Sequence, residues 1–498
     1  MATQLSEKLL TVSGLTIIPQ SVVPHDDAVF AAGRAGSLMR LVILAPAGSK
    51  YLAQFEGTLQ EHEGSKVLVG PNSAQNIASL REVLFWLNPQ LLGLYRSAGF
   101  GDRLGVATPG HIRALRAGPG NFAPIFAQQS IREMSRTGRS AQQVMDDAVW
   151  GVFAEGWRDG FGADADHLKT PADIDVCSAA GFTFYTIDPG EYVNNDAETM
   201  TADALKTAWD ALPWGELHDT PEALRKRYLN QTFDIEGHEL SFTEQELMRA
   251  AVKYGRVVTD VAMMYRHLAI VRSKLPYEME VSVDETDSPT KHPEHLYIAS
   301  ELRRLEVKWV SLAPRYIGRF EKGVDYIGNL NAFEADFAVH AALARYQGLY
   351  KLSLHSGSDK FSIYSIAAKH TRGVLHLKTA GTNWLEALRT VAEADPPFFR
   401  SIYGFAREHY ETDRATYHVS AQLDRAPQPD AVTDAELVGL IDQFDARQIL
   451  HVTFGSVLKA DNGQRFYPRL MQVLNENPEV YAGNLERLLK RHLDPFGK

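Results

Sequence analysis

The chain has 498 residues, of which 45% are hydrophobic and 23% are charged, so it can bury a large core and is not disordered. Its formal net charge of −11 argues against nucleic acid or a membrane surface as a partner, because both favour clustered lysine and arginine. Residues 1–20 lack a signal-peptide pattern, no window reaches about 18 uninterrupted apolar residues, and the single cysteine, Cys177, suits a reducing compartment. We expect a cytoplasmic protein with a small-molecule partner, and homo-oligomerisation stays open.

Residues 1–100 come first in chain order and show no repeated strand–helix pattern. Two extended stretches, "GLTIIPQSVV" and "LMRLVILAP", precede a helical stretch, "NIASLREVLFWLNPQLLGLY". This mixture predicts a small N-terminal α+β capping domain over residues 1–100. The glycines of "GFGD" (99–102) mark its predicted end.

From residue 101 onward the chain repeats a short strand, a polar turn and a helical stretch. Each predicted strand is rich in β-branched or aromatic residues and is bounded by glycine, proline or polar clusters. The eight predicted strands are residues 103–110, 182–190, 279–286, 307–314, 350–357, 373–381, 416–423 and 449–456.

Helix-start signals lie between these strands. They are capping boxes, or a threonine placed before a proline at the first helical position: Ser140 with Gln143, Thr243 with Glu246, Thr433 with Glu436, Thr170-Pro171 and Thr220-Pro221. Eight strands alternating with helices are typical of a (β/α)₈ TIM-type barrel. We predict an α/β barrel over residues 101–498, with long helical insertions around 119–180 and 191–275 after the first two strands.

Charged and imidazole side chains come at the ends of several predicted strands. The carboxyl ends of barrel strands carry the active site, and alternate residues face the barrel interior. By this alternation Ser282 and Asp284 face inward while the valines between and beside them face helices. The side chains expected at this mouth are Asp188, Asp284, Glu285, His355, Lys360, His376, Lys378 and His111.

Two imidazoles and a carboxylate around one mouth suit a borderline divalent cation such as Zn, Mn, Co or Ni. Structural alternatives stay open for each residue. A histidine in a strand can be a hydrogen-bonded core residue, and Asp284 and Glu285 can cap the following helix. Lys378 can pair with a carboxylate across the barrel, and Asp188-Pro189-Gly190 can form a turn.

Motifs for nucleotide cofactors are missing from the sequence. It contains neither G-x-G-x-x-G nor G-x-x-x-x-G-K-[ST], so we expect no nicotinamide or flavin. Arg132 and Arg136 in "QQSIREMSRTGRS" (128–140) can clamp a carboxylate or phosphate, although a solvated helix face is the alternative.

Several long strings of the sequence resemble one known family. They are "GDRLGVATPGHIRA", "AGFTFYTIDPGEYVNND", "VSVDETDSPT", "LHSGSDKFSIY" and "LHLKTAGTNWLEALR". Over roughly residues 95–460 the chain resembles the tagaturonate epimerase family, which interconverts D-tagaturonate and D-fructuronate in bacterial hexuronate catabolism. The resemblance implies a divalent metal and a hexuronate substrate.

The two sugar acids differ at one hydroxyl-bearing carbon that lies β to both the ketone and the carboxylate, so enolisation does not invert it. Without a nicotinamide motif, we favour retro-aldol cleavage, rotation and re-addition. The expected metal ligands are His355, His376 and Glu285, with Asp284 as the substitute for Glu285. Asp188 and Asp284 are the proton-transfer candidates, and Lys378 stabilises an oxyanion. The expected substrate-binding residues are His111, Arg132, Arg136, Lys360 and Asn383.

Three other functions stay open. An aldose–ketose isomerase of similar sugars would give an aldehyde–ketone shift, and an aldolase would release the two fragments. A non-catalytic sugar-acid-binding protein would bind without conversion.

Overall fold

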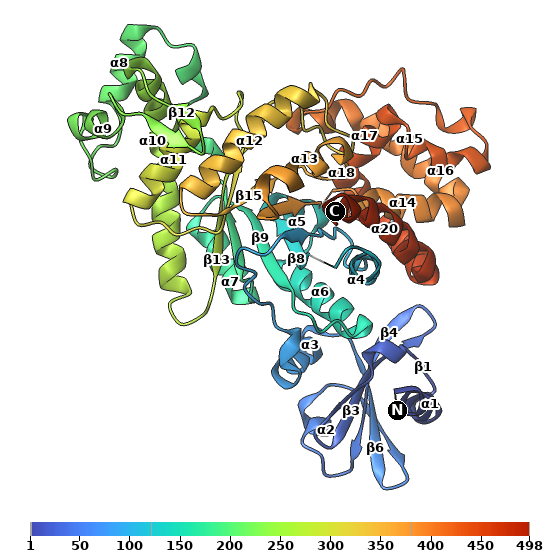
Figure 1. Ribbon diagram of the computed structural model, residues 1–498. Coiled ribbons are helices and arrows are strands. Elements are labelled where there is room, and N and C mark those ends of the chain that lie inside the picture. The colour runs from blue at the N-terminus through green and yellow to red at the C-terminus, as the bar shows by residue number, and fades with distance from the viewer. Residues whose placement is uncertain (1, 121, 380, 498) are drawn as a thin grey trace.

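Eight parallel strands close into a barrel in the computed structural model, which describes residues 2–120, 122–379 and 381–497. The hydrogen-bonded order around the barrel is β10-β13-β14-β15-β16-β7-β8-β9. Figure 1 shows several of these strands, among them β8, β9 and β13, with helices around them. The strands are β7 (Ser97–Gly99), β8 (Ala123–Ser130), β9 (Gly162–Leu168), β10 (Phe184–Ile187), β13 (Glu278–Val283), β14 (Ser311–Pro314), β15 (Lys351–Leu354) and β16 (Leu375–Lys378). The predicted (β/α)₈ barrel is therefore confirmed.

Alternation along β13 shows how the sequence builds the barrel wall. Every residue of this strand is buried, but Glu280 makes hydrogen bonds across the barrel interior, to Thr186 and Ser311. The intervening Met279, Val281 and Val283 join the hydrophobic core outside the barrel. Polar residues therefore face the axis while aliphatic residues face the helices, as the alternation predicted.

Three predicted strands are wrong. Residues 103–110 form a turn and the start of α4 (Thr108–Ala117), because the Asp102 carboxylate accepts hydrogen bonds from the amides of Leu104, Gly105 and Ala107. Residues 449–456 fall in α17 (Phe444–Val452) and α18 (Phe454–Lys459), whose aliphatic side chains pack in a helical core. In 416–423, the amides of Ser420 and Ala421 bond to the side chain of Gln448 instead of to a strand.

The three barrel strands that the sequence did not reveal are β7, β8 and β9. Their sequences, "SAG", "APIFAQQS" and "GADADHL", are rich in Ala, Gly, Ser, Gln and Asp, which do not favour strands or do so weakly. Residues 119–180 are thus part of the barrel and not an insertion. Our division into domains 1–100 and 101–498 stays a prediction, although β7 places residues 97–99 in the barrel.

The helices between the strands pack around the barrel, and the long segment after β10 is an insertion, as predicted around residues 191–275. It contains α8 (Ala202–Asp210), α9 (Pro221–Tyr228), β11 (Phe233–Ile235), β12 (His238–Leu240) and α10 (Glu244–Val271). Capping boxes are present at Ser140, Thr243 and Thr433. The other helices around the barrel are α5 (Ile131–Thr137), α6 (Ala141–Glu155), α7 (Pro171–Ala180), α11 (His292–Arg304), α12 (Leu330–Tyr346) and α13 (Phe361–Thr371).

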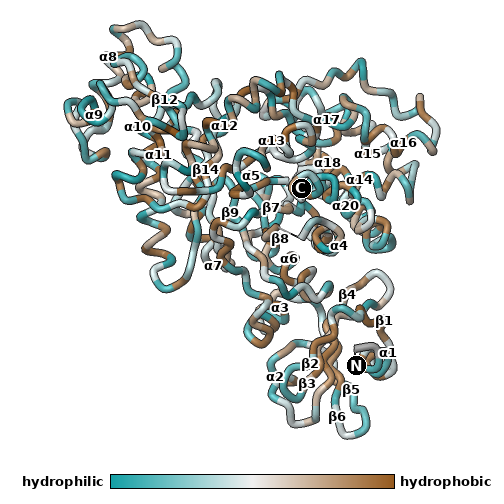
Figure 2. Tube along the Cα trace, in the orientation of Figure 1, coloured by the Kyte–Doolittle hydropathy of each residue, from teal (hydrophilic) through white to brown (hydrophobic). Residues whose placement is uncertain are grey.

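The N-terminal part is an antiparallel sheet of six strands, in the order β1-β3-β4-β6-β5 with β2 paired to β3. Figure 1 shows it apart from the barrel mouth, and Figure 2 shows the hydrophobic residues of its central strands. Its elements are α1 (Ala2–Ser13), β1 (Thr16–Ile17), β2 (Val23–His25), β3 (Ala28–Ala35), β4 (Leu38–Pro46), α2 (Tyr51–Gln54), β5 (Thr58–His62), β6 (Ser65–Pro71) and α3 (Ala74–Val83).

After β16 the described chain is helical and has a hydrophobic core of its own. Besides α17 and α18 it contains α14 (Asn383–Ala394), α15 (Pro396–Asp413), α16 (Leu437–Leu440), α19 (Tyr467–Glu476) and α20 (Pro478–Leu493). Across the described residues, no helix has both the length and the apolar character that crossing a bilayer requires.

The Asp102 turn gives a test of the fold. Replacing Asp102 by Ala leaves three amides without their acceptor, so the free energy of unfolding should fall by about 3 kcal/mol. Urea unfolding followed by circular dichroism measures this. Asp102→Asn is the matched control, because its one carbonyl oxygen keeps part of the network and the loss should be smaller. Equal midpoints for Asp102→Ala and the wild type would show that the turn is held by other contacts.

Candidate active site

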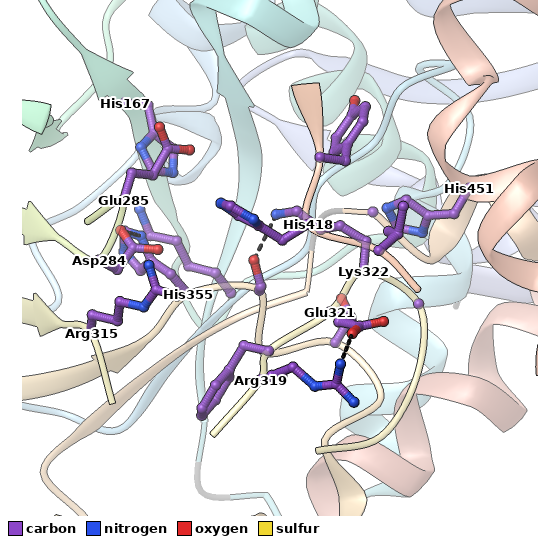
Figure 3. A pocket seen from close by; sticks show the side chains of 18 of the residues that line it. His167, Asp284, Glu285, Arg315, Arg319, Glu321, Lys322, His355, His418 and His451 are labelled. Carbon is purple, nitrogen blue, oxygen red and sulfur yellow. Dashed lines mark hydrogen bonds and ion pairs between the residues drawn. The ribbon is translucent and has the colours of Figure 1, made fainter. Parts of the chain in front are cut away.

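A cavity of about 620 Å³ lies at the carboxyl ends of the barrel strands. One side is built by residues at the ends of β9, β13 and β15, among them His167, Asp284 and His355. The opposite side is built by the segment after β14 and by the C-terminal region, with Lys322 and His451. Figure 3 shows these two groups facing each other across the cavity.

His167, Asp284 and His355 form a cluster that could hold a metal ion. Each offers one ligand atom, and these atoms lie within 4.8 Å of one another. Asp284 follows β13 and His355 follows β15, and the Nδ1 of His355 lies 3.0 Å from Oδ1 of Asp284. His167 forms a second such group with Asp188 and Glu285.

The orientation of His167 depends on an irregularity in β9. Simple alternation would turn its side chain away from the barrel axis, because Asp164 and Asp166 face inward. The register between β9 and β10 shifts at this point, and His167 has a φ of 51°, so both Asp166 and His167 line the cavity. Its Nδ1 lies 3.1 Å from Oδ2 of Asp188, which fixes the ring. A positive φ in a non-glycine residue beside a cavity is typical of a functional position.

Lys378 lies beside this cluster, among three buried carboxylates. Its Nζ is 3.0 Å from Asp164, 2.9 Å from Glu280 and 2.5 Å from Asp166. Burial lowers the pKa of Lys378, but the three carboxylates outweigh burial and raise the pKa well above its ordinary value. Lys378 is therefore a permanent ammonium group at neutral pH.

The carboxylates of this region outnumber its lysines. The carboxylates Asp164, Asp166, Asp188, Glu280 and Asp284 face Lys378 and the imidazoles of His167 and His355. Burial lowers the pKa of His355, but Asp284 and Glu280 outweigh it and raise the pKa to about 9. Burial also raises the pKa of Asp164 to about 6 against the pull of Lys378. This excess of negative charge, with two imidazoles at its edge, fits a divalent cation.

Five predicted site residues line the cavity: Asp284, Glu285, His355, Lys378 and Arg132. Arg132 pairs with Glu285 at 3.5 Å. Asp188 lies behind His167 and does not line the cavity. His376 is deeper in the barrel, where its Nδ1 lies 2.9 Å from the hydroxyl of Ser97, and burial lowers its pKa to about 3. Its expected place at the mouth is wrong, because it comes two residues before the end of β16.

Four further residues expected to contact substrate do not line the cavity. His111 packs against both Phe100 and Phe126, and its Nε2 lies 3.1 Å from the side-chain amide of Asn383. The ammonium of Lys360 is buried and donates to the carbonyls of Glu321, Val324 and Ser358. Arg136 donates to the hydroxyl of Tyr417. These side chains lie behind the cavity walls, and among the described residues Nδ1 of His111 and Oδ1 of Asn383 are buried without a hydrogen-bond partner.

Sequence reasoning missed the acidic strand β9 and the basic side of the cavity. The alternation in "GADADHL" was a signal for Asp164 and Asp166, but its low strand propensity concealed it. The segment after β14 supplies Arg315, Arg319 and Lys322, and the C-terminal region supplies the imidazoles of His418 and His451. No short motif marks them, since they meet only in the folded chain.

A closed β/α barrel with imidazoles, carboxylates and a buried lysine around the carboxyl ends of its strands defines an enzyme of the TIM-barrel class. A family model described as UxaE, tagaturonate epimerase, matches residues 18–496. The tagaturonate/fructuronate epimerase of Thermotoga maritima is 41% identical over 436 residues, which cover 87% of this chain and 88% of that protein. The chain belongs to the tagaturonate epimerase family, so the resemblance drawn from its sequence is confirmed.

Solved structures agree with this assignment. The native crystal structure of fructuronate-tagaturonate epimerase UxaE from Cohnella laeviribosi has a TM-score of 0.92 and 36% identity, and covers 100% of this chain and 99% of that one. A glycerol complex of the same protein gives a TM-score of 0.91 at 36% identity, with 99% of each chain covered.

The buried position of His111 predicts a pH dependence of stability. Burial lowers its pKa to about 4, against the attraction of Asp102. Below about pH 6.5 this imidazole becomes protonated in the unfolded chain, whereas in the folded chain it stays neutral down to about pH 4. The free energy of unfolding therefore falls as pH falls through this window. At pH 5 this part amounts to about 2 kcal/mol.

The test is urea unfolding at pH 7 and pH 5. His111→Gln keeps an acceptor for Asn383 and should lose less stability between the two values than the wild type does. His62→Gln, at a partly exposed imidazole, is the control and should behave as the wild type. Equal losses in His111→Gln and the wild type would contradict a neutral buried imidazole.

Proposed function

We propose that this protein interconverts D-tagaturonate and D-fructuronate. Its membership of the tagaturonate epimerase family supports this, because the relatives from Thermotoga maritima and Cohnella laeviribosi carry that activity in their names. The observation that carries the proposal is the cavity at the barrel mouth, which brings the cluster of His167, Asp284 and His355 together with arginine and lysine side chains. A hexuronate ketose has a ketone and its hydroxyls near one end and a carboxylate at the other, so the cluster suits the ketone end and the basic side chains suit the carboxylate.

We propose that His167, Asp284 and His355 hold a divalent cation, one of Zn, Mn, Co or Ni. The donor set of two imidazoles and one carboxylate suits these metals and leaves coordination positions open. When bound, such a cation supplies Lewis-acid polarisation of the substrate ketone. Asp284 thus takes the ligand role first expected for Glu285, since Glu285 pairs with Arg132 instead.

The inverted carbon lies β to both the ketone and the carboxylate, so its proton is not acidified and a retro-aldol route is the simplest one that inverts it. In this mechanism a base takes the proton of the β-hydroxyl group, the bond between the α and β carbons breaks, and the aldehyde rotates before the bond reforms. Glu285 lines the cavity and is not one of the three residues proposed to hold the cation, and its carboxylate lies within 4.8 Å of a ring nitrogen of His167. We assign it to move this proton.

Other residues of the chain would hold the fragments and their charges. Lys378 is a fixed ammonium group, so it would stabilise the negative charge that develops on the ketone fragment. Asp188 orients His167 through their 3.1 Å contact. Arg132, Arg315 and Lys322 line the cavity and would bind the substrate carboxylate, keeping the aldehyde fragment in place while it turns.

The decisive experiment follows D-tagaturonate by NMR with protein stripped by chelator and then given Mn, Co, Ni or Zn. D-Fructuronate should appear only with a metal. An aldehyde–ketone shift would instead indicate an isomerase, and free three-carbon fragments would indicate an aldolase. Tight binding with no conversion under any metal would leave a non-catalytic sugar-acid-binding protein.

The positions of His355 and His376 predict different metal requirements. In His355→Gln a proposed ligand is lost, so the metal concentration for half-maximal rate should rise at least about tenfold. In His376→Asn the bond to Ser97 is preserved and no proposed ligand changes, so this concentration should stay as in the wild type. Rate measurements over a metal titration test both variants. An equal rise of this metal concentration in both variants would indicate that His376 is a metal ligand after all.

A further inference from the structure

A second group of metal-ligating side chains lies between helices α11 and α12. His292 and His295 are three residues apart on α11, and Asp336 and His340 are four residues apart on α12, so each pair lies on one face of its helix. None of the four lines the cavity. The proposed epimerase activity does not use them.

Three of these side chains converge closely enough to share one ion. The Nε2 of His292 lies 3.0 Å from Oδ1 of Asp336, and the Nε2 of His340 lies 3.6 Å from Oδ2 of the same carboxylate. One ligand atom from each of the three lies within 4.8 Å of the others. Two ligands at about 2.1 Å from a tetrahedral ion are roughly 3.4 Å apart, so the observed spacings need only small side-chain adjustments.

The ligand atoms of His340 and Asp336 lack hydrogen bonds. Among the described residues, Nε2 of His340 and Oδ2 of Asp336 are buried and have no hydrogen-bond partner. His340 is fully buried, with no exposed side-chain surface. A separation of 3.6 Å is too long for a hydrogen bond between them. Two buried polar atoms without hydrogen bonds need a partner, and a cation is a partner that both can bind.

The other nitrogen of His340 is held by a relay. Its Nδ1 lies 2.8 Å from Nδ1 of His295, and Nε2 of His295 lies 2.6 Å from the hydroxyl of Tyr350. If His340 donates through Nδ1, its Nε2 carries a lone pair aimed at Asp336. A metal-ligating histidine that donates its second N–H to an outer partner has this same arrangement.

We propose that His292, Asp336 and His340 form a second metal site, for Zn²⁺. Two imidazoles and one carboxylate are ligands that zinc prefers. His292 is the most exposed of the three, with 26% of its side-chain surface accessible, so the fourth position opens toward solvent and takes a water molecule. His295 and Tyr350 orient His340 from behind.

The site would join two segments that both line the cavity. Helix α11 follows β13 through residues 284–291, and α12 follows β14 through residues 315–329. Asp284, Arg315 and Lys322 come from these segments and line the cavity. A backbone hydrogen bond already joins the two segments, because the amide of Thr290 donates to the carbonyl of Arg315 at 2.8 Å. An ion between the helices behind them adds a clamp, so its role is structural.

The test counts Zn²⁺ ions in protein stripped by chelator, by titration calorimetry with Zn²⁺ alone. The background carries His355→Gln, which weakens the site proposed in the cavity. In this background Asp336→Asn and His292→Gln should each remove one equivalent of bound Zn²⁺ and abolish the rise in melting temperature that Zn²⁺ produces. His267→Gln is the matched control, because His267 pairs with Asp175 at 2.7 Å. Neither residue belongs to a group that could hold a metal ion among the described residues. This variant should bind as the background does.

The outcomes are separable from those of the proposed function. Unchanged Zn²⁺ stoichiometry in both Asp336→Asn and His292→Gln would overturn the second site, whatever the activity. Loss of one equivalent would support it even if D-tagaturonate is not converted. Asp336→Asn keeps the size of the side chain and His292 is partly exposed, so both variants should fold. Circular dichroism of the metal-free proteins detects a variant that does not fold.

Discussion

The burial of three carboxylates around one ammonium group is the constraint on which the barrel depends. Asp164, Asp166 and Glu280 come from two strands, and Lys378 from a third. An unpaired charge at this depth costs several kcal/mol, whereas the pairs and the hydroxyls of Thr186 and Ser311 offset that cost. The carboxylates lie on β9 and β13 and Lys378 lies on β16, and no two of these strands are neighbours in the sheet, so closure of the barrel brings the charges together. The interior that holds the fold together is also the floor of the cavity.

The walls of the cavity are fixed from outside by the C-terminal helices. Arg447 on α17 donates to the carbonyl of Gly323 and to the carboxylate of Asp359, while the amide of Asp359 donates to His492 on α20. The loop after β15 therefore divides its roles. Ser356 and Ser358 face the cavity, and Asp359 turns back to bind these helices. A helical C-terminal region thus replaces the strand–helix repeat expected there, and it contributes Tyr417, His418 and His451, among others, to the lining of the cavity.

The sequence predicted those parts of the fold in which local propensity and burial agree. β13 and β15 combine aliphatic residues with alternation, and the capping boxes at Ser140 and Thr243 are local devices whose hydrogen bonds form within one turn. β9 could not be recognised, because its strand is stabilised by ion pairs inside the barrel and not by β-branched residues. His167 was missed for a second reason. Its direction depends on a register shift and a positive φ, which no pattern of residue types reveals.

The opposite error, in which polar residues were assigned to the mouth, has a common physical origin. His111, His376 and Lys360 are fully buried, and a buried polar group must find partners wherever it lies. His376 forms a hydrogen bond with Ser97, and Lys360 donates to three backbone carbonyls. A histidine in an apolar strand is therefore ambiguous until its second nitrogen is placed. In His355 both nitrogens face carboxylates, Glu280 at 2.7 Å and Asp284 at 3.0 Å, whereas Nε2 of His376 faces no polar atom among the described residues. What separates the two is the charge around each imidazole, because His355 lies between two carboxylates and lines the cavity, whereas His376 does not line it.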